Sequence, residues 1–128
     1  TDFYANFRIG ECYKQGGKFD EAIEYFSKSL LYANKDDEVF NSKIMIFRTN
    51  LLRRTPDRAE QILREIENDY RFTDSTKQIF FWKGWLNIFY DNFKMAAYYF
   101  SKSQGDNELK KNWDRVLVCL RLRTQSLR

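Results

Sequence analysis

No arrangement of side chains in this sequence is typical of acid, base or nucleophilic catalysis. The 128 residues include no histidine, and Cys12 and Cys119 lack the paired spacing of a metal or redox motif. Without histidine, neither a Ser-His-Asp triad nor a Cys-His pair can be assembled. The remaining acidic candidates are Glu60, Glu65, Glu67 and Asp69. Their spacing is typical of a solvated helix face, so the sequence predicts a protein without catalytic residues, metal site or cofactor.

The residues that must position any functional group belong to a pattern that occurs twice. Gly10, Phe19, Ala22 and Phe26-Ser27-Lys28-Ser29 return as Gly84, Phe93, Ala96 and Phe100-Ser101-Lys102-Ser103, each 74 positions later. Half of that offset falls on Ala59 and Leu63, which indicates a period of 37 residues and a degenerate middle copy. A period between about 20 and 50 residues is typical of stacked supersecondary units. We therefore expect three repeats, over residues 3–36, 37–73 and 74–106.

Each repeat is predicted to be a helical hairpin, because apolar residues recur at helical spacing between glycine, proline and polar turn signals. In the first hairpin, Gly16-Gly17 ends the first helix, and the small side chain of Ala22 lets the two helices approach closely. Thr55-Pro56 begins a helix expected to reach Tyr70. The first two predicted helices cover about residues 3–15 and 19–32. The third begins within 34–37 and reaches at least Leu51, the fourth runs from 56 to about 70, the fifth follows a cap within 73–75 and ends at Tyr90, and the sixth covers 93–103. A seventh, capping helix is expected over about 107–125. The fold class is therefore all-α, in one domain of about seven helices.

The cysteines and the hydropathy bear on location. In a stack of hairpins, Cys12 and Cys119 lie too far apart for the Cα separation of about 4.4–6.8 Å that a disulfide needs. We expect two buried free thiols, which favours a reducing, cytoplasmic location over the periplasm. The longest apolar run, residues 79–90, contains Lys83 and Asn87 and is shorter than the roughly 20 residues of a membrane span. The sequence thus predicts a soluble protein, and the start at Thr1 suggests a piece of a longer one.

The repeated residues resemble the tetratricopeptide repeat (TPR) family, whose unit is a helical hairpin with small residues at fixed positions. The first repeat is most similar, and the matching residues are Ile9, Gly10, Tyr13, Gly17, Ala22, Phe26 and Ser29. The third repeat keeps Gly84, Ala96, Phe100 and Ser103, whereas the second keeps Ala59 with Leu63 and Ile66. The resemblance implies a right-handed solenoid that serves as a non-catalytic scaffold for protein–protein interaction.

The period of 37 residues is longer than the 34 of most TPR units. Second helices that end in tyrosine, such as Glu67-Asn68-Asp69-Tyr70, resemble extended repeats of bacterial outer-membrane assembly lipoproteins and Tol–Pal-associated proteins. The resemblance thus leaves a periplasmic envelope-assembly component as an alternative to a cytoplasmic adaptor.

In the TPR family, the first helices of successive units line a concave groove that holds a partner segment. By helical phase, the resemblance assigns the groove to Tyr4, Phe7, Arg8, Glu11, Asn41, Ile44, Met45, Arg48, Gln78, Phe81, Trp82 and Trp85. This mixture of aromatic, aliphatic and arginine side chains is enriched at protein interfaces. Some of the aromatics are equally compatible with the core, since a phase error of one residue rotates a side chain by about 100°.

Some TPR domains grip a chaperone's C-terminal carboxylate with Lys, Asn and Arg side chains from three repeats. The corresponding positions here hold Phe7, Glu11, Met45, Gln78 and Trp82. None matches, so the resemblance does not extend to a chaperone-type carboxylate clamp, and the partner is an unidentified protein or peptide.

Two further functions stay open. Binding of RNA is suggested by Arg53-Arg54, Arg58, Arg64 and the basic C-terminal end, where residues 107–128 hold six basic and two acidic side chains. Residues 1–38 oppose a continuous phosphate track, because they hold five basic and eight acidic side chains. Self-association through the apolar surface is the other alternative.

Overall fold

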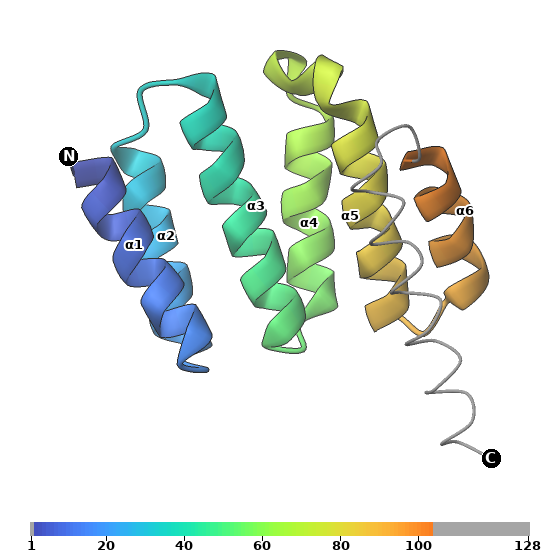
Figure 1. Cartoon of the computed structure of the whole chain (residues 1–128), viewed down its shortest axis with the longest axis horizontal. Helices are drawn as coiled ribbons and strands as arrows, with labels where there is room; N and C mark the ends of the chain where they lie inside the picture. The colour runs from blue at the N-terminus through green and yellow to red at the C-terminus, as the bar shows by residue number, and fades with distance from the viewer. Residues whose placement is uncertain (1, 104–128) are drawn as a thin grey trace. The chain divides into compact units, whose positions relative to one another are not determined.

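A computed structural model of the chain describes residues 2–103 (Figure 1). The predicted capping helix over 107–125 and Cys119 lie outside the described residues. The elements are α1 (Asp2–Gln15), α2 (Phe19–Leu31), α3 (Asp36–Leu52), α4 (Pro56–Glu67), the 3-10 helix η1 (Tyr70–Ser75), α5 (Thr76–Phe89) and α6 (Phe93–Ser103). No strand occurs between residues 2 and 103, so the all-α prediction is confirmed for this part of the chain.

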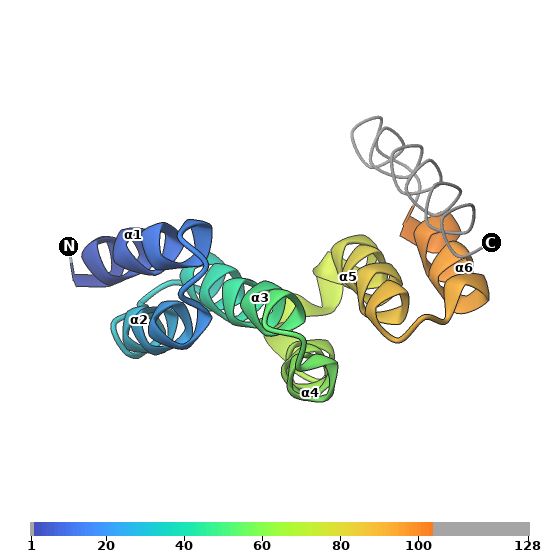
Figure 2. The same cartoon turned by 90° about the horizontal axis from the view of Figure 1, so that it is seen from below.

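The described residues divide into two compact units. Unit 1 ends at Asp74, and unit 2 begins at Ser75 and is described through Ser103. Within unit 1, α1 packs on α2, α2 on α3, and α3 on α4. Figure 2 shows α1 and α3 in an upper layer and α2 and α4 in a lower one. Within unit 2, α5 packs on α6. The border between the units lies beside the predicted start of the third repeat.

The hairpin turns have the same backbone conformation at intervals of 37 residues. Positive φ angles occur at Gly17 (79°), Arg54 (67°) and Asp91 (61°), each just after the first helix of a hairpin. In all three turns the next amide donates a hydrogen bond to the carbonyl five residues earlier, at 2.8–2.9 Å from N to O, as in a Schellman motif. The turn geometry therefore recurs with the period of the sequence pattern, although only the first turn uses glycine.

The small and large residues of the repeat are complementary in volume. In unit 1, an added Cβ at Gly10 would lie 2.8 Å from the ring of Phe26, and in unit 2 one at Gly84 would lie 2.7 Å from Phe100. The middle hairpin has fully buried Phe47 at the position of the glycine. There Leu63 takes the place of the second-helix phenylalanine. A larger side chain on one helix thus accompanies a smaller one on the other.

The fourth helix ends earlier than predicted. It was expected to reach Tyr70, but α4 ends at Glu67 and η1 follows. The carboxylate of Asp69 accepts a hydrogen bond from the backbone amide of Arg71, with 3.0 Å between Oδ1 and N. Such a local side-chain acceptor offers the backbone an alternative to the helical pattern. The predicted end, at about Tyr70, lies three residues beyond the observed one, because apolar spacing does not include this contact.

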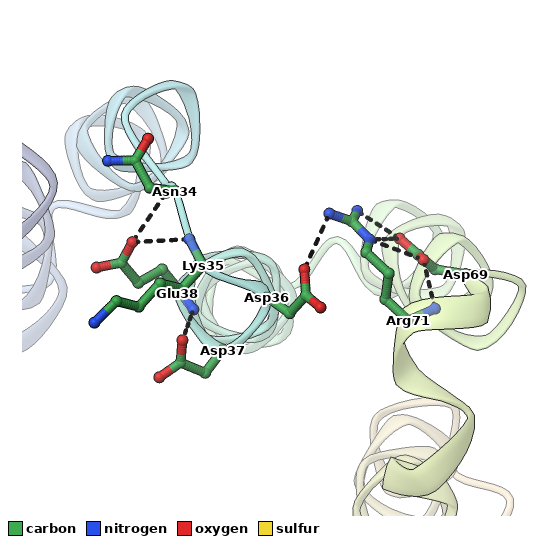
Figure 3. A network of polar contacts seen from close by, with 7 residues as sticks. All are labelled: Asn34, Lys35, Asp36, Asp37, Glu38, Asp69 and Arg71. Atoms are coloured by element: carbon green, nitrogen blue, oxygen red, sulfur yellow. Dashed lines mark hydrogen bonds and ion pairs between the residues drawn. The ribbon is translucent and has the colours of Figure 1, made fainter.

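Polar contacts tie the end of α4 to the start of α3 (Figure 3). The Arg71 guanidinium lies 2.7 Å from Asp69 and 3.8 Å from Asp36, the first residue of α3. At the same end of α3, Oε1 of Glu38 accepts hydrogen bonds from the backbone amides that precede the helix, including that of Lys35 at 3.2 Å. These contacts satisfy donors that the helix itself cannot. They fix the entry into α3, which carries four of the predicted groove residues.

Candidate functional site

The predicted groove residues are distributed over the two units. Tyr4, Phe7, Arg8 and Glu11 lie on α1, and Asn41, Ile44, Met45 and Arg48 lie on α3, all in unit 1. Gln78, Phe81, Trp82 and Trp85 lie on α5 in unit 2. Eight of the predicted groove residues therefore belong to unit 1 and four to unit 2.

Several apolar members of the unit 1 set belong to the interior. The ring of Phe7 contacts that of Phe26 edge to face, with 5.5 Å between the centroids. Met45 is a buried member of the core cluster that includes Ala22 and Phe26, and Phe7 packs against that cluster. Ile44 is also buried. These side chains hold α1, α2 and α3 together and leave little surface for a ligand.

The polar members of unit 1 lie at the surface and gather between α1 and α3. Arg8 is exposed, and its Nη1 lies 3.9 Å from Oε1 of Glu11. Arg48 on α3 is half-buried and places its Nη1 3.6 Å from the sulfur of Met45. Tyr4 and Asn41 are exposed on the same two helices. The structure thus brings Arg8, Glu11 and Arg48 into one polar surface.

Lys14 joins this surface, although the sequence did not single it out. It lies one helical turn after Glu11 on α1, and that spacing was the signal that could have identified it. Burial lowers the pKa of the Lys14 ammonium, and the positive charge of Arg48 lowers it further, while Glu11 opposes both effects. We call Arg8, Lys14, Arg48 and Glu11 the cationic cluster.

Burial and mutual repulsion act on the cations of the cationic cluster. Burial lowers the pKa of the Arg48 guanidinium, and the carboxylate of Glu11 acts in the opposite direction. The carboxylate of Glu11 thus acts on all three cations, and two of the cations are partly removed from water. A partly desolvated cation attracts an anion more strongly than a fully hydrated one does.

In unit 2, two of the three predicted aromatic residues pack on one phenylalanine of α6. Phe81 and Trp85 each contact Phe100 edge to face, with centroid distances of 5.7 and 6.0 Å. Trp82 contacts Phe81 at 5.1 Å and is half-buried, as are the other two. Gln78 is exposed at the start of α5. Phe81 and Trp85 therefore contribute to the hairpin core, and all three aromatic residues present only part of their surface.

The acidic residues that could act as acids or bases form ion pairs. Glu60, Glu65 and Asp69 each pair with a cation: Arg64 at 2.8 Å, Lys43 at 3.8 Å and Arg71 at 2.7 Å. Among residues 2–103, no three His, Cys, Asp or Glu side chains lie close enough together to hold a metal ion.

The expectation for Cys12 was wrong, because its thiol is exposed. The buried face of α1 runs through Phe3 and Gly10. Cys12 follows Gly10 by two residues, about 200° around the helix, and so faces away from the core.

None of the helices described between Asp2 and Ser103 is both long and apolar enough to cross a membrane. Comparison of the chain with protein-family models, curated proteins and solved structures finds no match.

Proposed function

We propose that this chain is a non-catalytic interaction module that holds a segment of another protein on the surface formed by the first helices of its repeats. In this proposal the hairpins are TPR-like units that continue one another as a right-handed solenoid. The turns at Gly17, Arg54 and Asp91 support it, since one conformation recurs at a fixed spacing of 37 residues. Repeats of this kind stack on their neighbours and create extended binding surfaces.

The cationic cluster between α1 and α3 indicates what kind of segment would bind. Lys14 and Arg48 are partly buried, and the positive charge of Arg48 lowers the pKa of Lys14. A carboxylate on the bound segment would relieve the repulsion between these two cations and form charge-assisted hydrogen bonds. We therefore propose an acidic segment, with exposed Tyr4 of α1 providing apolar contact.

Selection from a library of displayed 12-residue peptides tests this function. We expect acidic peptides to be enriched, and their affinity to fall roughly tenfold for the double variant Lys14→Gln/Arg48→Gln, since two charge-assisted contacts are lost. Arg64→Gln is the matched control, because Arg64 is an exposed cation on α4. Enrichment of neutral or basic peptides, or equal losses for the double variant and the control, would contradict the proposal.

Binding of RNA has less support from the contacts. Two of the arginines that suggested it are paired with carboxylates, Arg53 with Asp20 at 2.7 Å and Arg64 with Glu60 at 2.8 Å. A phosphate would have to compete with these partners. The exposed free thiol of Cys12 fits a reducing, cytoplasmic location better than an oxidising periplasm.

A further inference from the structure

Unit 1 contains a cavity in its other layer, separate from the cationic cluster. The cavity has a volume of about 430 Å³ and lies between α2 and α4, over α3. In Figure 2 these two helices form the lower layer of unit 1, whereas α1 lies in the upper one. The volume is within the range of about 300–1,000 Å³ that is typical of ligand sites, near its lower end.

The floor of the cavity is aliphatic. It is formed by Ile23 of α2, Ile46 of α3 and Ile62 of α4. Ile46 is buried in the core cluster of unit 1, and Ile23 and Ile62 pack against that cluster while remaining half-buried. Branched apolar side chains from three helices thus meet at a surface that is open to water. Covering them with another aliphatic side chain would be favourable, because apolar area would leave water.

The rim of the cavity carries an excess positive charge. Arg53, Arg58 and Glu65 line it. Arg53 is neutralised by Asp20 at 2.7 Å, and Glu65 by Lys43 at 3.8 Å. Arg58 is exposed and makes no ion pair within residues 2–103. One guanidinium is therefore available beside the isoleucine floor.

We propose that this cavity binds a segment of a partner protein in which an aliphatic side chain lies next to a carboxylate. The aliphatic side chain rests on Ile23, Ile46 and Ile62, and the carboxylate pairs with Arg58. A peptide suits the site, because the cavity is formed between neighbouring helices, where a backbone can stay in solvent while one side chain is inserted. The site is independent of the surface between α1 and α3.

Titration of the 128-residue protein, labelled with ¹³C at its isoleucine methyl groups, tests this assignment by NMR. The probe is the blocked tripeptide acetyl-Glu-Leu-Glu-amide, and acetyl-Gln-Leu-Gln-amide is its neutral counterpart. We expect the acidic probe to shift the methyl signals of Ile23, Ile46 and Ile62, whereas Ile79, buried on α5 of unit 2, should not respond. The neutral probe should bind about threefold to fivefold more weakly, as for the loss of an exposed ion pair.

Two variants distinguish a specific contact from general attraction. Arg58→Gln should weaken binding of the acidic probe about threefold to fivefold, whereas Arg64→Gln, on the same helix but outside the cavity, should leave it unchanged. Gln61→Glu places a negative charge in the lining and should weaken binding as well. Circular dichroism verifies that each variant is folded.

Several results would overturn the assignment. They are the absence of shifts at the three cavity methyl groups, equal binding of the neutral probe, equal losses for Arg58→Gln and Arg64→Gln, or shifts of Ile79 as large as those of the cavity methyl groups. Shifts of the cavity methyl groups by octanoate but not by the peptide would assign the site to a fatty acid and overturn the peptide. The peptide selection on the cationic cluster is unaffected by any of these results, so the two proposals fail separately.

Discussion

The backbone of Gly10 lies directly against the ring of Phe26, so that a Cβ at position 10 would be 2.8 Å from Cδ1 and Cε1 of the ring. Real Cβ contacts are essentially never this short. Phe26 is fully buried and can move away only by displacing its neighbours. The close approach of α1 and α2 thus depends on the absence of a side chain at one position.

Gly10→Ala should therefore destabilise the protein by about 1–3 kcal/mol, the usual cost of overpacking a core. Alanine favours a helix by roughly 1 kcal/mol over glycine, so a net loss shows that the steric clash prevails. Urea unfolding followed by circular dichroism measures the difference. The control is Gly16→Ala, where the nearest atom would be 3.5 Å from the new Cβ, and we expect a change of less than about 0.5 kcal/mol.

A second substitution tests the cause. The middle hairpin combines a larger residue, Phe47, with a smaller one, Leu63, at the equivalent positions. Phe26→Leu added to Gly10→Ala should therefore cost less than the sum of the two single changes, because each relieves the defect that the other creates. Additive losses would mean that the clash with Phe26 is not the reason for the glycine.

Arg54→Gly should stabilise the second hairpin. Arg54 has φ of 67°, a conformation that costs an ordinary L-residue roughly 1–2 kcal/mol and glycine very little. Glycine also loses more entropy on folding, so we expect a net gain of about 0.5–1 kcal/mol. Thermal unfolding provides the measurement, and Arg54→Lys, which keeps a positive charge, should be nearly neutral. Stabilisation by lysine as great as by glycine would show that the side chain and not the backbone determines the effect.

The ion pair between Asp69 and Arg71 makes stability depend on pH in the acid range. Hydrogen bonds from Arg71 lower the pKa of the Asp69 carboxyl from its ordinary value of 3.8 to about 2. Between these two values the unfolded chain binds a proton that the folded protein does not, so stability rises with pH. The contribution of Asp69 is fully present above about pH 4 and is lost as the pH falls towards 2.

The measurement is the urea midpoint from pH 5 to pH 2 for the wild type and for Asp69→Asn. The asparagine variant should be less stable near pH 5 and should lose less stability on acidification, because it lacks the titrating group. Asp74→Asn replaces an exposed aspartate in the same segment and should keep the wild-type pH dependence. Parallel curves for the wild type and Asp69→Asn would exclude Asp69 as the cause.

The helices were predictable because their signals are local. Apolar spacing, Gly16-Gly17 and Thr55-Pro56 predict where helices begin and end, and the structure agrees to within three residues in the described part. The 3-10 helix after α4 was not predicted, since it depends on a side-chain contact of Asp69 with the backbone. Local helix propensity does not predict when a side chain competes with the helix for a backbone amide.

The candidate site was less predictable, because it depends on helical phase and on contacts between helices. The assignment of Phe7 to a groove rested on phase, and the structure places its ring against Phe26 in the core. Lys14 belongs to the site because the charge of Arg48 acts on it. Arg48 lies 34 positions later in the sequence and on another helix. A single sequence does not reveal which side chains of α1 and α3 come together.

Glu11→Gln should strengthen the binding of an acidic peptide recovered by selection on the cationic cluster. Glu11 is the carboxylate that Arg8 approaches at 3.9 Å and that opposes the lowering of the pKa of Lys14 and Arg48. Its neutralisation leaves three cations for the incoming carboxylate, and we expect affinity to rise about twofold to fivefold at low salt. Fluorescence anisotropy of the labelled peptide gives the Kd, and the gain in affinity should shrink as salt screens the charges.

Glu24→Gln, which removes an exposed carboxylate from α2, is the control and should change the Kd less. If Glu11→Gln weakens binding instead, the carboxylate of Glu11 contributes to the bound state, and the proposed charge complementarity at this surface is wrong.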